Sequence, residues 1–374
     1  MEMTINNTSS VSLDYVIHHR LMENIAAIVY TSVLLVVGVP GNTLVCYVYY
    51  RWKDKNPSKV FILSLAMIDL FNCLVTMPTE LSMMTNPMNF DFNIICKLSR
   101  FFTYLCNTLA ALIMIVIAVD RYRKICTPDK RSMNHRQAKT AVGACFVVSI
   151  FSTWPALVMY GTFTTVLDTN VFAKNCFVEN RFLNSPYVLS YFAFHSIATI
   201  TIFIVISVLY TFIGLAVYKR WKFRRQFLSS SKDLLVRMSR SNNSRNHLDT
   251  PGSMTCLDSV SGMRNSSAIR NEHIRPPKKQ NIKLEKTTFM LFVVTLTYIV
   301  SFIPFLTLAI HRSIHPGEWE HITHAGEIVY QVFLRSYLLN SCVNPIIYSF
   351  CNSLFRRECK KICCNRRTVS HSLS

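Results

Sequence analysis

Seven long stretches of this chain are nearly free of charged residues, and this feature limits its possible folds more than any other. Five of the stretches contain no Asp, Glu, Lys or Arg, and the other two contain one charge each, Asp69 and Arg335. A helix needs about 20 apolar residues to cross the hydrocarbon core of a bilayer. We therefore expect seven transmembrane helices, one in each of the stretches 24–50, 60–79, 101–119, 140–167, 182–218, 287–311 and 328–355.

The expected fold class is an all-α membrane protein, a bundle of seven transmembrane helices. The strands of a membrane β-barrel would show weak alternation of apolar and polar residues in place of these continuous apolar runs. Composition agrees, since only 16% of the 374 residues are charged, against about 25% in an average soluble domain. The high apolar share, 51%, also argues against a disordered chain.

Lys and Arg are divided unequally between the segments that connect the stretches. Of the 40 Lys and Arg residues, 33 lie in residues 51–59, 121–139, 219–286 and after 355, which alternate along the chain with poorly basic connections. Because basic loops face the cytoplasm, we expect the N-terminus outside and the C-terminus inside. This topology explains the net charge of +20 without a nucleic-acid partner, and it suits contact with anionic membrane lipid.

Polarity divides the chain into three parts. Residues 1–24 form a polar tail that we expect to be extracellular, residues 25–355 the seven-transmembrane domain and residues 356–374 a cytoplasmic tail. Within the domain, residues from about 222 to 283 are rich in Ser, Asn and Arg, which predicts a long, largely disordered cytoplasmic loop with helical extensions of its flanking spans. The N-terminal tail lacks the apolar core of a cleavable signal peptide, so the first span is expected to serve as an uncleaved anchor.

Both tails carry candidate modification sites. Asn6 and Asn7 lie in overlapping glycosylation sequons. The basic residues 352–361 predict a short amphipathic helix at the cytoplasmic membrane surface. Juxtamembrane cysteines beside Lys and Arg predict palmitoylation, and the candidates here are Cys359, Cys363 and Cys364.

Several short motifs lie at related depths in the predicted spans. An acidic-Arg-Tyr tripeptide ends the third span, 25 residues after a cysteine on the opposite side, and an Asn-Pro pair precedes a Tyr at the end of the seventh. In this context the motifs resemble those of the rhodopsin-like (class A) G-protein-coupled receptors. The positions that carry the resemblance are Gly41-Asn42, Asp69, Cys96, Asp120-Arg121-Tyr122, Asn344-Pro345 and Tyr348.

The resemblance implies a multi-pass plasma-membrane receptor that binds an extracellular ligand and activates a heterotrimeric G protein. It implies arrestin and a receptor kinase as further partners, no required cofactor and no enzymatic activity. It also implies a disulfide between Cys96 and Cys176, which would join the second outer loop to the third span. The spans hold no catalytic set, since Asp69 has no acidic partner in a span and His195 lies near the outer surface.

The same resemblance assigns residues to G-protein activation. In the family, Arg121 would be held by Asp120 in the inactive state and released on activation toward the G protein. The residues that the family places in this process are Asp120, Arg121, Tyr122, Tyr210 and Tyr348.

An aromatic switch is expected in the sixth span, with departures from the family pattern. The usual Phe, Cys and Trp are replaced here by Tyr298, Ser301 and Phe302, whereas Pro304 is retained and should kink the helix. Phe302 is the candidate switch at the floor of the ligand pocket. Asn344 and Pro345 of the seventh span belong to the same expected activation path.

A charge inside the bilayer is costly, so Asp69 should face the bundle interior and have a function. In the family this position binds a sodium ion, whose hard oxygen ligands would here be Asp69, Asn340, Ser341 and Asn344. Ala110 stands where a serine ligand is usual. The alternative is a polar network filled by water without an ion.

The ligand class is less constrained. Thr103 stands where amine receptors carry Asp, and Leu338 stands where opsins carry the retinal Lys, which disfavours both subfamilies. A mildly acidic outer surface favours a basic, neuropeptide-like ligand, and Pro78 and the long outer loop resemble those of peptide-binding members of the family. A lipid or other small molecule, and more distantly a transporter or channel, remain alternatives. Candidate pocket residues are Thr103, Asn107, His195, Phe302, Phe305, Tyr330, Gln331 and Leu334.

Overall fold

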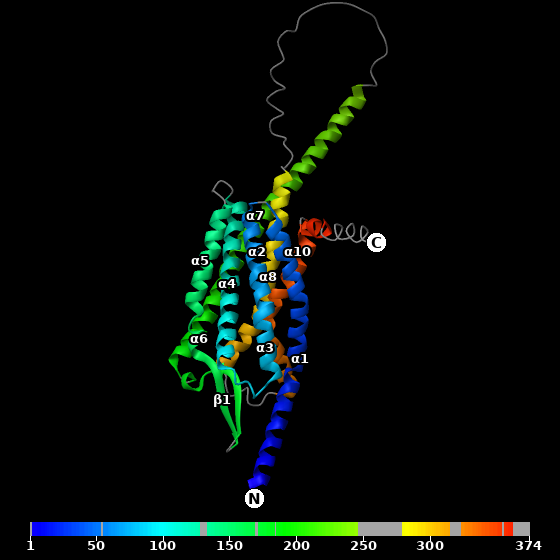
Figure 1. Ribbon diagram of the computed structural model, residues 1–374. Helices are drawn as coiled ribbons and strands as arrows, with labels where there is room; N and C mark the ends of the chain where they lie inside the picture. The colour runs from blue at the N-terminus through cyan, green and yellow to red at the C-terminus, as the bar shows by residue number, and fades with distance from the viewer. Residues whose placement is uncertain are drawn as a thin grey trace, which may run out of the picture.

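The computed structural model describes residues 2–53, 55–127, 133–168, 171–183, 185–245, 279–314, 323–353 and 355–361. Its long helices run side by side in an elongated bundle, with a two-stranded hairpin at one end (Figure 1). We call the hairpin end the outer end and the opposite end the inner end. The described α-helices are α1 (Glu2–Arg51), α2 (Pro57–Phe71), α3 (Met77–Thr85), α4 (Asn93–Cys126), α5 (His135–Thr153), α6 (Ala156–Met159), α7 (Pro186–Arg245), α8 (Lys279–Ile314), α9 (His324–Phe333) and α10 (Asn340–Cys351).

Among the described residues, six helical segments are long and apolar enough to cross a membrane. The second of them is continuous through α2, the π-helical turn η1 (Asn72–Thr76) and α3. The seventh predicted span is divided into α9, the 3₁₀ turn η4 (Ser336–Leu339) and α10. The division falls at Arg335, whose backbone leaves the helical region at φ −108° and ψ 10°.

The all-α prediction missed one element, a β-hairpin at the outer end. Strands β1 (Tyr160–Asp168) and β2 (Val171–Val178) pair antiparallel, with Tyr160 opposite Val178. The uncharged stretch 140–167 was read as one span, but its last part is rich in Thr, Val and Phe, which favour a strand. A short 3₁₀ turn, η2 (Asn180–Phe182), follows β2.

Side-chain and backbone contacts fix this hairpin on the bundle. Cys176 of β2 forms a disulfide with Cys96 of α4. Lys174 exchanges two backbone hydrogen bonds with the loop before α4, one with Met88 and one with Phe90, each 2.8 Å long. On the outer edge of β1, the Asn180 side chain donates to the carbonyl of Thr164 (2.7 Å) and accepts from its amide (2.9 Å).

The ends of two helices differ from the predicted domain boundaries. α1 begins at Glu2, so the expected N-terminal tail is helical over most of its length, and α7 continues to Arg245; the two project past opposite ends of the bundle (Figure 1). The helical extensions around the third inner loop are therefore longer than expected, and residues 246–278 lie outside the described part. Residues 355–361 form the helix expected after the seventh span. The side chains of Asn6 and Asn7, and Cys363 and Cys364, lie outside the described residues.

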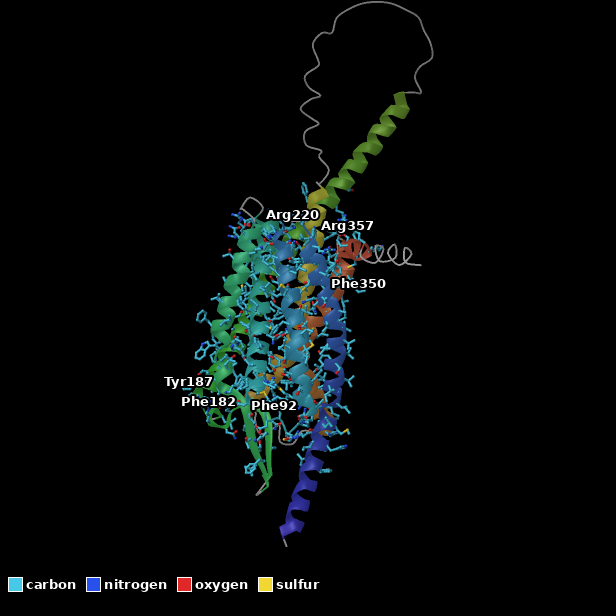
Figure 2. All side chains as sticks on the ribbon, viewed as in Figure 1. Phe92, Phe182, Tyr187, Arg220, Phe350 and Arg357 are labelled. Atoms are coloured by element: carbon cyan, nitrogen blue, oxygen red, sulfur yellow. A yellow bond between two sulfur atoms is a disulfide. The ribbon has the colours of Figure 1, made fainter. Side chains whose placement is uncertain are left out.

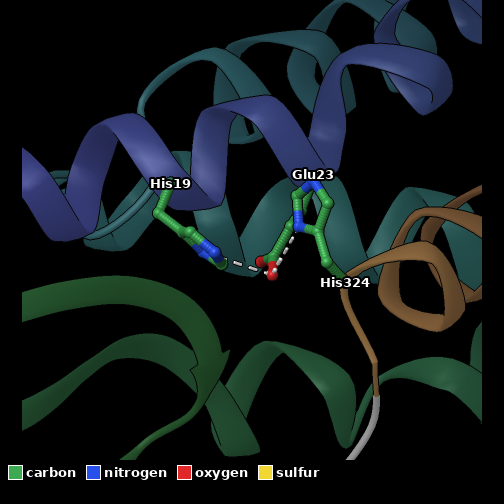
Figure 3. Close-up of side chains that lie close together, drawn as sticks. All are labelled: His19, Glu23 and His324. Carbon is green, nitrogen blue, oxygen red and sulfur yellow. Dashed lines mark ion pairs between the residues drawn. The ribbon is translucent and has the colours of Figure 1, made fainter.

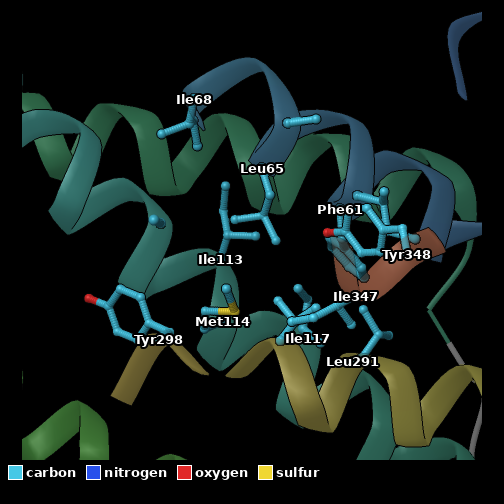
Figure 4. Packing of buried hydrophobic residues seen from close by; sticks show 14 of the residues in the cluster. Phe61, Leu65, Ile68, Ile113, Met114, Ile117, Leu291, Tyr298, Ile347 and Tyr348 are labelled. Atoms are coloured by element: carbon cyan, nitrogen blue, oxygen red, sulfur yellow. The ribbon is translucent and has the colours of Figure 1, made fainter. Parts of the chain in front are cut away.

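The core lies around α4, the helix with neighbours on most sides. Its middle turns pack against α2, α8 and α10 in one apolar cluster that includes Leu65, Ile113, Met114, Ile117, Leu291 and Tyr298 (Figure 4). Large apolar side chains also cover the outside, and Tyr187 and Phe350 are more than 70% exposed (Figure 2). An apolar outer surface around an apolar core is the pattern of a bundle surrounded by lipid.

Candidate functional site

At the inner end of α4, Asp120 and Arg121 form a buried ion pair. The Arg121 Nε atom donates to Asp120 Oδ2 at 3.1 Å, and its terminal nitrogen also donates to Ser58 Oγ of α2 at 2.9 Å. Lys124, one turn further along α4, donates to the same carboxylate oxygen at 2.9 Å. Arg121 is 1% exposed and Asp120 is fully buried. The carboxylate therefore holds two cations, and Arg121 is fixed between α4 and α2.

Tyr210 and Tyr348, which the resemblance places in G-protein activation with Arg121, have other neighbours in this arrangement. The Tyr210 hydroxyl of α7 lies 3.2 Å from Thr295 Oγ1 of α8. Tyr348 of α10 is fully buried, and its ring packs 6.3 Å from that of Tyr49, while its hydroxyl has no hydrogen-bond partner among the described residues. Among the described residues, Arg121 therefore bonds to Asp120, and neither tyrosine hydroxyl bonds to it.

Tyr122, the last residue of the tripeptide, and Arg220 join α4 to α7. The Tyr122 ring meets that of Phe212 edge-on at 6.3 Å. Arg220 donates to the carbonyl of Ile125 near the end of α4. The sequence predicted Tyr122 as a functional residue but gave no signal for Arg220, because its partner is a backbone atom.

The predicted switch residues form an aromatic group in α8. The Phe302 ring lies 4.7 Å from that of Tyr298 and 5.9 Å from that of Tyr337 in η4. Pro304 lies inside α8, and the next amide, of Phe305, donates to Ser336 Oγ at 3.3 Å. The sixth span is thereby joined to the break in the seventh.

Asp69 lies in a buried polar cluster formed by α1, α2 and α10. Asn344 Nδ2 donates to Asp69 Oδ2 at 2.8 Å, and Asn42 Nδ2 donates to the Ser341 carbonyl at 2.6 Å. The sequence did not predict Asn72, which donates to Ser341 Oγ at 3.2 Å. Among the described residues, three buried amide oxygens have no hydrogen-bond partner, those of Asn42, Asn340 and Asn344.

The candidate ligand residues do not form one set of free polar groups. The Thr103 hydroxyl donates to the Ser99 carbonyl of its own helix (2.8 Å), and Gln331 donates to Glu327 (2.9 Å). His195 Nε2 lies 3.3 Å from the Ser152 carbonyl, and its ring packs 4.5 Å from Tyr191. The remaining candidates are buried or half-buried, namely Asn107, Phe302, Phe305, Tyr330 and Leu334.

The outer half of the bundle contains a buried charge cluster that the sequence analysis missed. Arg100 of α4 donates to Glu80 Oε1 of α3 at 2.5 Å, and Arg335 Nε lies 3.5 Å from Glu80 Oε2. Glu80 is 2% exposed. Arg335 was available as a signal, because a single charge in an apolar stretch requires a partner, as for Asp69.

The expected acidic outer surface is largely neutralised by pairing. Glu179 lies 2.5 Å from Lys97 and 2.7 Å from Arg181, and Asp91 lies 2.5 Å from Lys174. Glu23 and Glu327 are paired as well, both with Arg20, so every described acid side chain that faces this end has a cationic partner. The predicted attraction for a basic ligand is weakened accordingly.

The disulfide is expected to stabilise the outer end measurably. In Cys176→Ser, β2 keeps its backbone bonds to Met88 and Phe90 but loses its covalent link to α4, and removing a disulfide typically costs about 2–5 kcal/mol. We expect a lower Tm of the purified protein, with Cys351→Ser, a free half-buried cysteine, as the control. An unchanged Tm in Cys176→Ser would contradict this role.

Comparison with known proteins decides the family. A family model described as "7 transmembrane receptor (rhodopsin family)" matches residues 41–348, most of the chain. The chain belongs to this rhodopsin family of receptors. The disulfide, the buried Asp120–Arg121 pair and the broken seventh span are thus features of a seven-transmembrane signalling receptor and not of an enzyme.

Relatives of this rhodopsin-family receptor differ in the ligands in their names. The cholecystokinin receptor type A of Homo sapiens is 26% identical, over 95% of this chain and 84% of its own length. The nematocin receptor 2 of Caenorhabditis elegans is 25% identical, over 92% of this chain and 80% of its own length. The D(1A) dopamine receptor of Xenopus laevis is also 25% identical, over 92% of this chain and 75% of its own length. Identity alone therefore does not choose between ligand classes.

Proposed function

We propose that the receptor lies in the plasma membrane with its N-terminus outside, binds an extracellular neuropeptide and activates a heterotrimeric G protein. The observation that carries the signalling part is the buried Asp120–Arg121 pair at the inner end of α4. The basic character of the inner connections supports the orientation. Arrestin, a receptor kinase and anionic lipid are further partners of the same inner face.

A peptide fits this receptor better than an amine. The names of the cholecystokinin and nematocin receptors point to peptides. A ligand ammonium would need a free carboxylate, but Thr103 supplies only a hydroxyl that donates to its own helix. The buried outer acids Glu23 and Glu80 are already paired with Arg20 and Arg100. An outer surface of paired charges and aromatic rings suits a mixed peptide surface more than a single cation.

Activation is a shift between two populated states. In the state described, Arg121 is held by Asp120 and Ser58, so it is not free for a G protein. A ligand that binds the outer end better when the inner end is open shifts the population toward that state. The aromatic contacts from Phe302 to Tyr337, together with the Ser336 contact, form a physical connection between the sixth and seventh spans along this route.

The test is a signalling assay in cultured cells. The full chain is expressed with a promiscuous G-protein α subunit, and calcium is recorded against a panel of amidated and free-acid neuropeptides, with Arg121→Ala as the matched control. A sub-micromolar peptide response that is absent in the control supports the proposal. Surface expression without any peptide response, or a response to lipids alone, would instead favour a non-peptide ligand.

We infer that the Asp69 cluster holds a sodium ion. The donor set fits a hard cation, because Asp69 supplies a buried carboxylate bonded to Asn344, and the buried amide oxygens of Asn42, Asn340 and Asn344 lack hydrogen-bond partners among the described residues. An ion there would join α2 to α10 and so favour the state in which Arg121 is held by Asp120 and Ser58. Ala110 leaves the site one hydroxyl short of the ligand set that is usual in the family.

Asp69→Asn is expected to remove the sodium dependence of the receptor. In the unmodified receptor, replacing sodium by a large organic cation should raise basal G-protein activity, and in Asp69→Asn the two buffers should give the same activity. The measurement is the basal rate of nucleotide exchange on the G protein, in membranes that contain either the unmodified receptor or Asp69→Asn. An equal effect of sodium on the two proteins would indicate a water-filled network.

The residues after the seventh span are proposed to lie on the inner membrane surface and to be palmitoylated. Residues 355–361 are helical, and Cys359 is half-buried against the bundle. On the exposed side of this helix, Lys361 bonds to Glu358 at 2.9 Å, which holds the pKa of that carboxyl below its usual range. Cys363 and Cys364 remain the other candidate acylation sites, and Asn6 and Asn7 the candidate glycosylation sites.

A further inference from the structure

A cluster of one carboxylate and two imidazoles joins the outer ends of the first and seventh spans. His19 and Glu23 lie one turn apart on α1, and His324 is the first residue of α9. His19 Nδ1 is 3.3 Å and His324 Nδ1 is 3.7 Å from the same oxygen, Glu23 Oε1. Figure 3 shows the two rings on either side of the carboxylate, each aimed at it. All three candidate ligand atoms lie within 4.8 Å of one another.

These distances match a tetrahedral zinc site. Zinc binds imidazole nitrogen and carboxylate oxygen at about 2.0–2.2 Å, which places neighbouring ligand atoms of a tetrahedron about 3.3–3.6 Å apart. The two nitrogen–oxygen distances, 3.3 and 3.7 Å, are already near this value. Two imidazoles also select zinc over calcium and magnesium, which prefer oxygen ligands alone.

The surroundings favour a bound metal with one open position. The Glu23 side chain is 6% exposed, whereas those of His19 and His324 are 48% and 51% exposed, so a metal can enter from solvent and keep a water as its fourth ligand. Arg20 donates to the second oxygen, Glu23 Oε2, at 2.9 Å. This contact orients the carboxylate so that Oε1 faces the imidazoles, as an outer-shell partner does in known metal sites.

We propose that His19, Glu23 and His324 bind a zinc ion at the outer surface of the receptor. The ion would tie α1 to the start of α9, the helix that leads to the break at Arg335 and to η4. A cross-link between the first and seventh spans restricts their relative movement, so zinc would stabilise one arrangement of the outer bundle. The site is separate from Asp69 and Arg121 and does not depend on the identity of the ligand.

A thermal-unfolding experiment on the purified full-length receptor tests the proposal. The receptor in detergent, freed of metal with a chelator, is titrated with zinc chloride, and calcium and magnesium chloride serve as metal controls. Zinc alone is expected to raise Tm, because a ligand that binds only the folded state stabilises it. In His19→Ala or His324→Ala, the zinc concentration that gives half of this shift should rise on the order of tenfold or more.

His18→Ala is the matched control, because His18 is the neighbouring exposed imidazole on α1 and lies outside the cluster. It should respond to zinc as the unmodified receptor does. If zinc raises Tm equally in the unmodified receptor and in the three variants, or raises it in none of them, the cluster does not bind zinc and consists only of contacts between the histidines and Glu23. Should a variant fail to fold, cobalt(II) replaces zinc in the unmodified receptor, where one equivalent must give the intense visible bands of a tetrahedral site. Neither assay uses a peptide or a G protein, so its outcome is independent of the proposed signalling function.

Discussion

Arg121→Ala is expected to remove ligand-stimulated G-protein activation while the receptor still reaches the cell surface. Among the described residues, the Arg121 guanidinium bonds to Asp120 and Ser58 at the inner end, far from the outer end, so we expect the substitution to leave ligand binding unaffected. Coupling between sites in such switches typically amounts to about 5–150-fold in affinity. We therefore expect stimulated nucleotide exchange to fall toward the basal rate, with surface expression measured by an epitope tag. Normal stimulation by Arg121→Ala would contradict the assigned role.

The complementary variant Asp120→Asn should act in the opposite direction. It removes the buried carboxylate that holds both Arg121 and Lys124, so Arg121 becomes free without ligand. Basal nucleotide exchange should rise above that of the unmodified receptor. Lys124→Gln leaves the Asp120–Arg121 pair in place and is the control, with a much smaller expected change.

Glu80→Gln is expected to destabilise the outer end strongly. The substitution removes the carboxylate that pairs with Arg100 of α4 and with Arg335 of the seventh span, and both guanidinium groups lose this partner. Breaking a buried ion pair by removing one partner typically costs about 3–5 kcal/mol. Because the Arg100 side chain is 22% exposed, we expect the lower part of this range, seen as a reduced Tm and reduced surface expression.

Two further variants test whether burial of this ion pair causes the loss of stability. The double variant Glu80→Gln with Arg100→Gln should recover part of the lost stability, because it removes one unpaired cation, and a double-mutant cycle gives the coupling energy. Asp91→Asn breaks an exposed pair with Lys174 and should cost less than about 1 kcal/mol. Equal losses for Asp91→Asn and Glu80→Gln would show that burial is not the cause.

The sequence predicted the seven spans, and the motifs of the receptor family predicted the Cys96–Cys176 disulfide and the contact between Asp69 and Asn344. The uncharged runs identified the spans directly, whereas the pairing of Asp120 with Arg121 was implied by the resemblance to the receptor family, because adjacent residues of a helix do not face each other. The Glu80–Arg100–Arg335 cluster was missed because its members come from three helices that only the packed bundle brings together. An apolar run likewise does not distinguish a helix from a strand, which is why residues 160–167 were assigned to a span.

The Asn180 amide at the edge of β1 has a consequence for how extended chains meet this protein. A free strand edge recruits other extended chains by backbone pairing. Here the Asn180 side chain already occupies both hydrogen-bonding groups of Thr164, as the backbone of a third strand would. The hairpin is thereby protected at this position against strand addition and edge-to-edge aggregation. An extended peptide therefore cannot pair its backbone with β1 at Thr164 unless the Asn180 side chain moves away.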